Sequence, residues 1–137
     1  MNRSEAREYA FKMVYGLEIQ KEFSRQQYDL FMENAEIKEK AAINYLEEVF
    51  EGIEKNKEEI LDLISQNLKK DWTIQRISKV NLAILEIAIF EIKYTEIPFK
   101  VAINEAVELA KRYGDEAAPL FVNGVLASVV NENKGKN

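Results

Sequence analysis

The sequence predicts an all-α protein, and three observations lead to that prediction. The 137 residues include only five Gly and two Pro, whereas Glu, Lys, Ala, Ile and Leu are abundant, a composition typical of helices. Apolar residues make up 47% of the chain, which is enough to form a buried core. They recur at spacings of three and four, the period of an amphipathic helix. We therefore expect a single compact bundle of about seven helices with short connections.

Four apolar stripes predict four helices in the first half of the chain. The first stripe lies within residues 6–17. Ser24, with Gln27 three residues later, has the spacing of a capping box and opens a short second helix. The third and fourth stripes, within residues 42–53 and 60–68, are separated by a polar break. The core residues expected from these stripes are Ala6, Tyr9, Ala10, Met13, Val14, Leu17, Tyr28, Phe31, Met32, Ala42, Tyr45, Leu46, Val49, Phe50, Ile53, Ile60, Leu61, Ile64 and Leu68.

Three more helices are predicted in the second half. In the stretch Trp72–Ile92 apolar residues occupy nearly all sides of the helix, which indicates a central helix buried on several faces. Pro98 follows a turn and lies in the first turn of the next helix. That helix ends at Gly114, which we expect to adopt a positive φ. The last stripe lies within residues 118–129, and the polar tail from Asn131 is expected to fray.

The composition argues against an enzyme and against a metal site. The chain has no Cys and no His, which removes thiolate chemistry, the usual general base near neutral pH and the commonest ligand of zinc. No two glycines lie close enough to form a phosphate-binding loop. Glu105 and Glu108 are three residues apart, but without His they do not form a di-iron carboxylate pattern and are expected on a solvated helix face. We expect no catalysis, no metal and no cofactor.

Location and charge are also constrained by the sequence. No apolar signal-peptide segment follows Met1, and the longest apolar stretch, residues 84–92, is far too short to span a membrane, so a cytoplasmic protein is expected. Glu91, among apolar neighbours in that stretch, is expected to meet a Lys or a helix N-terminus.

The net charge is −5, so any binding to nucleic acid must use a local basic patch. One such cluster comprises Lys69, Lys70, Arg76 and Lys79, although on charge alone an ordinary solvated surface explains it.

Gly124 is unusual because it interrupts an apolar stripe, where Gly costs roughly 1 kcal/mol relative to Ala. One interpretation is a close helix–helix approach at Gly124, with interhelical hydrogen bonds from Asn104 and Asn123. The other is a polar surface next to Phe121, near a helix start whose free N–H groups favour anions such as phosphate. The pattern alone leaves both open.

Several segments resemble the signature of the NusB family. The principal ones are residues 97–111 (IPFKVAINEAVELAK) with the following Gly114, and residues 121–126 (FVNGVL). Residues 6–10 (AREYA) and the block from Ile84 to Glu91 match as well. The resemblance covers almost the whole chain and is densest from residue 72 to 126. It implies two stacked three-helix bundles, with an N-terminal half of about residues 1–70, a C-terminal half of about 71–131 and a polar tail at 132–137.

The resemblance also implies a function. NusB proteins bind the boxA element of nascent ribosomal RNA transcripts together with NusE, the small-subunit ribosomal protein. The pair joins other Nus factors on RNA polymerase and suppresses premature termination. The same fold forms the N-terminal domain of certain cytosine-5 methyltransferases that act on ribosomal RNA; since these 137 residues include no methyltransferase domain, we expect a stand-alone NusB. Some family members form homodimers that hide the RNA surface, and the sequence does not decide whether this chain does.

Individual residues can be assigned from the resemblance. Arg3 and Arg7 are expected to contact RNA phosphates, Phe121 to stack on a base, and Asn123 to contribute to the same RNA surface. The resemblance also implies that the starts of the first and last helices adjoin, which would unite these residues.

The chain departs from the family pattern at several of these positions. Asn81 stands where an acidic residue contacts NusE, and the position of Glu86 is usually Arg; both are assigned to the partner surface. Ser4 and Glu5 stand where arginines are common, and Leu120 replaces a residue that is often basic. A second hypothesis is therefore a NusB-like helical protein-interaction module with weakened or lost RNA binding.

Overall fold

The computed structural model describes the backbone of residues 1–135 and the side chains of residues 1–131. Within this range the chain forms seven α-helices and one short 3₁₀ helix, which confirms the predicted all-α class. Their bounds are α1 Arg3–Gln20, α2 Arg25–Ala35, α3 Lys40–Lys55, α4 Lys57–Gln66, η1 Ile74–Arg76, α5 Lys79–Tyr94, α6 Phe99–Tyr113 and α7 Ala118–Gly135.

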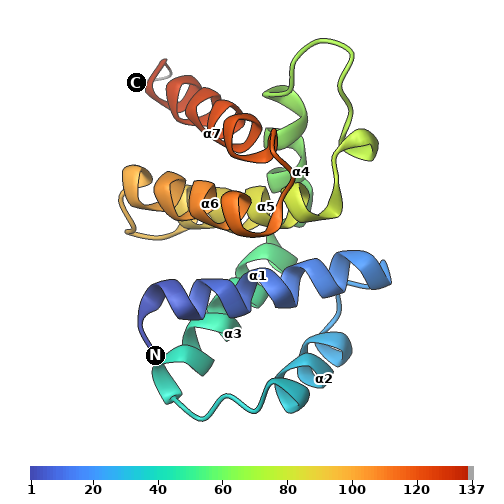
Figure 1. The fold of residues 1–137 in the computed structure, drawn as a ribbon, viewed down its shortest axis with the longest axis vertical. Helices are drawn as coiled ribbons and strands as arrows, with labels where there is room; N and C mark the ends of the chain where they lie inside the picture. Colours follow the sequence, from blue (N-terminus) through green and yellow to red (C-terminus); the bar gives the residue numbers. More distant parts are fainter. Residues whose placement is uncertain (136–137) are drawn as a thin grey trace.

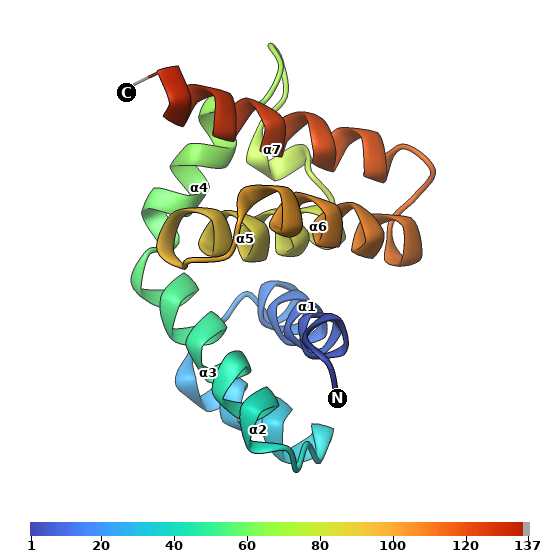
Figure 2. The same cartoon turned by 90° about the vertical axis from the view of Figure 1, so that its left-hand side faces the viewer.

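The helices are arranged in two groups along the long axis of the molecule. Helices α1, α2 and α3 lie at one end, α4 and α7 lie at the other, and α5 and α6 lie between α1 and α7 in both views (Figures 1 and 2). Helix α5 packs against α1, α3, α4, α6 and α7. Helix α4 contacts α3, α5 and α7, so we propose that the boundary between the two halves lies near Asn56. This proposed boundary differs from the one near residue 70 that the sequence predicts.

The central helix α5 is shorter than the sequence predicts. It begins at Lys79 instead of Trp72, because the Ser78 side chain caps it by accepting a hydrogen bond from the backbone N–H of Asn81 at 3.1 Å. Asp71 has a positive φ of 74°, and the chain between α4 and α5 forms a loop with one 3₁₀ turn. Every residue from 82 to 91 is buried, which confirms the prediction of a helix covered on several faces.

Other helix ends also differ in detail from the prediction. At α2, Ser24 accepts a hydrogen bond from the backbone N–H of Gln27 at 3.2 Å, as expected. The capping box with both reciprocal bonds is found at α1, between Asn2 and Glu5. Pro98 is the N-cap of α6 and not part of its first turn. Helix α7 continues to Gly135, past the expected start of the polar tail, and residues 136 and 137 lie outside the described range.

Gly114 ends α6, but the prediction of a left-handed conformation there is wrong. Its φ is −92° and its ψ is 178°, an extended geometry that any residue adopts. The need for Gly comes instead from close packing, because the chain folds back directly into α7. A Cβ atom at this position would lie 2.5 Å from the Cβ of Ala118 and 2.9 Å from the carbonyl oxygen of Ala110.

We expect Gly114→Ala to lower the free energy of unfolding by about 1–3 kcal/mol, the usual cost of overpacking. Urea denaturation measures this change, and Gly16→Ala is the matched control. A Cβ at Gly16, within α1, meets nothing within 4 Å, so this substitution should stabilise the helix by up to about 1 kcal/mol. Equal stability of the two variants would contradict the proposed clash.

Candidate nucleic-acid interface

Arg3 lies exposed in the first turn of α1, at an open pocket between the starts of α1 and α6. Its guanidinium carbon is 4.5 Å from the centroid of the Tyr45 ring, a cation–π contact. Among the described residues no carboxylate forms an ion pair with Arg3. The pocket has a volume of about 600 Å³ and is lined by Asn2, Arg3, Ser4, Arg7, Ile97, Pro98, Val101 and Glu105. Arg3 is therefore available to an external anion.

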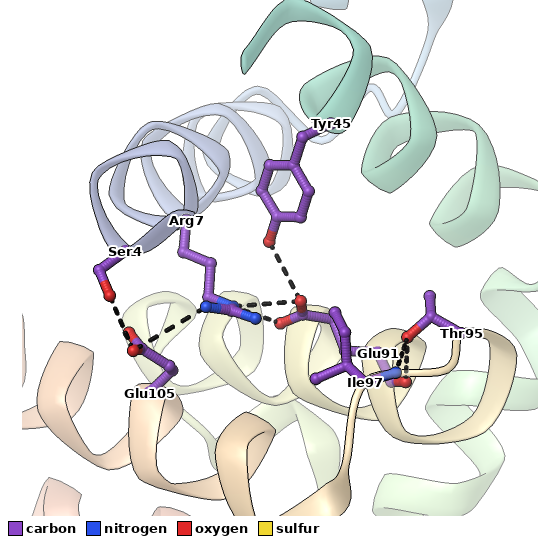
Figure 3. Close-up of polar contacts among 7 residues, drawn as sticks. All are labelled: Ser4, Arg7, Tyr45, Glu91, Thr95, Ile97 and Glu105. Carbon is purple, nitrogen blue, oxygen red and sulfur yellow. Dashed lines mark hydrogen bonds and ion pairs between the residues drawn. The ribbon is translucent and has the colours of Figure 1, made fainter. Parts of the chain in front are cut away.

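Arg7 is buried, whereas its predicted contact with RNA phosphates requires a side chain that reaches solvent. It is 4% exposed, and its Nε donates to Glu91 Oε1 at 2.9 Å and to Oε2 at 3.1 Å (Figure 3). This side chain projects from the face of α1 that packs on α5. Arg7 is the counter-ion of the buried Glu91 carboxylate. The sequence predicted a Lys or a helix N-terminus in this role, so that prediction is wrong.

Around this pair a polar network joins four helices. The Tyr45 hydroxyl of α3 donates to Glu91 Oε2 at 3.4 Å, and Arg7 Nη1 lies 3.9 Å from Glu105 Oε1 of α6. Ser4 donates to the same Glu105 oxygen at 2.8 Å. Burial lowers the pKa of the Arg7 guanidinium, but the hydrogen bond and charge of Glu91 outweigh this effect and raise the pKa overall. Arg7 is thus a charged side chain held in place by its surroundings and facing away from solvent.

Phe121 lies at a second, larger pocket on the other side of α5 and α6. The pocket has a volume of about 800 Å³ and lies between α7, the end of α4 and the loop that follows α4. The ring centroid of Phe121 is 6.1 Å from that of Trp72, with 42° between the ring planes. Trp72 is 46% exposed and Leu120 is 82% exposed. The lining residues are Gln66, Asn67, Leu68, Lys69, Trp72, Ala117, Leu120, Phe121, Asn123, Gly124, Val125 and Ser128.

Phe121 belongs both to the core and to the open pocket. The ring is half-buried and packs against the core, yet it also lines the open pocket beside the exposed Asn123. The free N–H groups expected near it are partly occupied. Asp115 accepts hydrogen bonds from Ala118 and, through its carboxylate, from Ala117, both at 3.1 Å. Anion binding at the start of α7 is therefore weakened by a carboxylate that is already there.

The two pockets do not form one surface, so the predicted juxtaposition of the α1 and α7 starts is wrong. The start of α1 meets the first half of α6, as the Ser4–Glu105 hydrogen bond and the residues around the Arg3 pocket show. Helices α5 and α6 separate α1 from α7 (Figure 2), and the two pockets share no lining residue. Arg3 and Phe121 therefore lie at separate places.

The two residues assigned to the partner surface are placed differently. Asn81 is half-buried in the first turn of α5, and its Oδ1 is buried without a hydrogen-bond partner. Glu86 is 0% exposed and accepts a hydrogen bond from Lys57 Nζ at 2.6 Å, which also donates to Glu18 at 2.6 Å. Burial raises the pKa of Glu86 to about 7 despite the attraction of Lys57. In this fold Glu86 has no surface with which to contact a partner, which corrects its assignment.

Sequence reasoning missed the contribution of Trp72, which it assigned to the central helix. The signal was present, since Trp72 is the only Trp of the chain and stands in a polar, Lys-rich stretch. Lys69 and Arg76, treated as an ordinary solvated surface, belong to the same place. Lys69 lines the pocket, and the Arg76 guanidinium lies 5.3 Å from the Trp72 ring centroid.

Among the residues with described positions, no group of three or more His, Cys, Asp or Glu side chains is placed to hold a metal ion. None of the described helices has the length and apolar character needed to cross a membrane.

Comparison with known proteins identifies the family. The NusB family model matches residues 4–131. The transcription antitermination protein NusB of Clostridium perfringens (strain SM101) is 44% identical over 136 residues, covering 98% of this chain and 100% of that protein. The corresponding protein of Acetivibrio thermocellus is 46% identical over 131 residues, covering 95% and 89%.

Solved structures agree with the sequence comparison. A structure of T. maritima NusB superposes with a TM-score of 0.85 at 30% identity and covers 100% of this chain and 99% of that one. A chain from the crystal structure of the antitermination factors NusB and NusE in complex with dsRNA gives a TM-score of 0.85 at 27% identity, covering 95% and 96%. The chain belongs to the NusB family.

Proposed function

We propose that this protein is a transcription antitermination factor that binds boxA-type single-stranded RNA of ribosomal RNA transcripts together with NusE. Its relatives are named transcription antitermination protein NusB, and the structure of a similar NusB has been solved in complex with NusE and dsRNA. Other Nus factors and RNA polymerase are then indirect partners. Because the proposed role is in bacterial-type transcription, we place the protein in the cytoplasm. This role includes no catalysis.

The observation that supports this function best is the aromatic pocket on α7. Single-stranded RNA is read chiefly by stacking bases on aromatic rings and by hydrogen bonds to base edges. Phe121 supplies a ring at the pocket, and the exposed Asn123 supplies an amide beside it. In this proposal Phe121 stacks on a base, Asn123 contacts a base edge, and Arg3 contacts a phosphate at the other pocket.

The burial of the Arg7 side chain changes the role that we propose for this residue. Contact between Arg7 and phosphate would require both hydrogen bonds to Glu91 to break in a buried site, which is costly. We propose that Arg7 positions α1 on α5 and that Arg3 makes the phosphate contact of this helix. The proposed NusE surface is likewise reduced to Asn81, because Glu86 is buried.

The second candidate function is a helical protein-interaction module with weakened or lost RNA binding. Three observations favour it: the net charge of −5, the burial of Arg7 and the Asp115 carboxylate at the start of α7. A titration of boxA RNA against the purified protein, alone and with NusE at two salt concentrations, separates the two functions. Antitermination predicts weak binding alone and substantial binding with NusE. Absence of RNA binding in the presence of NusE would support the interaction module.

Phe121→Ala should weaken RNA binding in the presence of NusE by about 1–3 kcal/mol, the usual contribution of one stacked base. The salt dependence should stay unchanged, because no phosphate contact is lost. Arg3→Ala should instead lower the slope of log K against log salt by about 0.7, the value for one phosphate of a single strand. Since Phe121 is half-buried, the melting temperature of each variant must be measured in parallel. Unchanged RNA affinity of a folded Phe121→Ala protein would end the stacking role.

A further inference from the structure

Gly124 lies within α7, yet neither its backbone nor its packing requires a glycine. No glycine among the described residues has a positive φ, and a Cβ atom at Gly124 would meet nothing within 4 Å. The interpretation of a close helix–helix approach is therefore wrong, and Asn104 and Asn123 are exposed instead of bridging helices. A glycine in a helix interior destabilises it by roughly 0.5–1 kcal/mol relative to Ala. Among the described residues, neither packing nor backbone conformation accounts for a glycine at this position.

The position of Gly124 in the pocket suggests a different reason for the glycine. Gly124 is exposed and lines the 800 Å³ pocket together with Phe121 and Trp72. Without a side chain there, the backbone of α7 is open to a ligand that enters from solvent. A glycine at such a place is typical of sites where a ligand approaches the backbone closely.

The charge of this pocket differs from that of the whole protein. The chain has 24 acidic and 19 basic residues, yet none of the residues that line this pocket is acidic. Lys69 is part of the lining, and Arg76 packs on Trp72. Within the described part of the chain neither cation forms an ion pair, and Arg76 Nη1 donates only to the backbone oxygen of Asp71 at 3.1 Å. Their charges are therefore available to phosphate groups.

Trp72 presents a large aromatic surface at the same place. It is 46% exposed, and its ring lies beside that of Phe121. An exposed aromatic ring next to cations matches the stacking and electrostatic contacts that hold single-stranded nucleic acid.

We propose that this pocket holds an unstacked nucleobase of the bound RNA, which stacks on Trp72 beside Phe121 while its sugar–phosphate passes over Gly124. Lys69 and Arg76 then contact the flanking phosphates. Trp72 is a second base-stacking residue, and Gly124 provides the space for the backbone of the RNA. This inference rests on the proposed function and adds the residues of the loop between α4 and α5 to the RNA surface.

Two kinds of measurement on the complex with NusE test the proposal. Trp72 is the only Trp of this chain, so stacking of a base should quench its fluorescence as boxA RNA is added. A Trp72→Ala variant should bind the RNA roughly 5- to 150-fold more weakly, the range expected for one stacked base. Trp72→Phe keeps an aromatic surface and should retain most of the affinity.

Gly124 offers a test that is independent of protein stability. Gly124→Leu introduces a better helix former and fills the pocket, so we expect unchanged or higher thermal stability together with weaker RNA binding. Gly16→Ala is the control, because it also replaces a helical glycine whose Cβ position is free but which lies in α1, away from the pocket. Its RNA affinity should equal that of the unmodified protein.

The possible outcomes separate this inference from the proposed function. If the unmodified protein binds RNA with NusE and both Trp72→Ala and Gly124→Leu bind equally well, the inference is overturned while the function stands. If the unmodified protein binds no RNA, both are overturned. If the variants lose affinity for NusE in the absence of RNA, the pocket holds a side chain of the protein partner, and the assignment to a nucleobase is wrong.

Discussion

Arg7→Ala is expected to lower the free energy of unfolding by about 3–5 kcal/mol, because it leaves the buried carboxylate of Glu91 without its counter-ion. Arg7 is 4% exposed and Glu91 is 1% exposed, so water replaces little of the lost interaction. Among the described side chains, the Tyr45 hydroxyl, 3.4 Å from Glu91 Oε2, is then the remaining donor to this carboxylate. Urea denaturation at neutral pH measures the loss as a shift of the midpoint with an unchanged slope.

Two further variants separate the buried pair from a general effect of removing an arginine. Arg112 is 61% exposed and pairs with Glu8 on the surface, so Arg112→Ala should cost less than about 1 kcal/mol. The double variant Arg7→Met, Glu91→Leu replaces both charges with apolar side chains and should be more stable than Arg7→Ala alone. If Arg7→Ala and Arg112→Ala are equally stable, the network in Figure 3 does not hold the helices together as described.

The same variant tests the role of Arg7 in RNA binding. A residue that contacts phosphate would change the salt dependence of binding, whereas a residue that positions α1 would not. With the protein kept folded at low temperature, we therefore expect the slope for Arg7→Ala to match that of the unmodified protein. A slope lowered by about 0.7 would restore the phosphate contact implied by the family resemblance.

The fold was predictable from the sequence where a single physical rule decides the outcome. The apolar stripe of α3, from Ala42 to Ile53, is buried as expected, because helical periodicity directly encodes which face meets the core. Helix α5 begins later than its apolar pattern predicts, because the N-cap Ser78 sets its start. A glycine that follows a helix can serve either a positive φ or close packing, and at Gly114 only the position of Ala118 in the fold shows that packing is the cause.

The candidate site was less predictable, because it depends on which residues distant in sequence meet. Arg7 stands beside the stripe residue Ala6, and no local rule tells whether such a side chain turns outward or finds a buried partner such as Glu91, 84 residues away. The free space at Gly124 and the contact between Trp72 and Phe121 likewise depend on where the loop after α4 lies relative to α7. Sequence analysis identified Arg3, Phe121 and Asn123 but neither the other residues of the two pockets nor their arrangement.

The stability of the protein should increase as the pH falls from 8 to 5, and Glu86 should cause most of the change. This carboxyl group is fully buried, and its Oε1 has no hydrogen-bond partner. Lys57, at 2.6 Å from the other oxygen, is shared with Glu18. Burial therefore raises the pKa of Glu86 from 4.5 to about 7, although Lys57 acts in the opposite direction.

The direction of the effect follows from the two pKa values. Because the pKa of Glu86 is higher in the folded than in the unfolded chain, the folded state binds the proton more tightly. The resulting stabilisation is complete below the unfolded value of 4.5 and is lost as the pH rises through about 7. The difference between the two values corresponds to a change on the order of 3 kcal/mol. Since the chain contains no His, few other groups titrate in this range.

Urea denaturation of the unmodified protein and of Glu86→Gln at several pH values between 5 and 8 tests this prediction. Gln has the same shape without the titrating charge, and Lys57 keeps its bond to Glu18. The variant should therefore lose the pH dependence and be at least as stable as the unmodified protein at pH 8. Glu59→Gln is the control, because Glu59 is 50% exposed, its pKa is lowered by its hydrogen bond to Lys93, and its titration falls below this range. A stability of the unmodified protein that is constant from pH 5 to 8 would mean that the Lys57 ammonium fully compensates the buried charge, so that Glu86 remains ionised throughout.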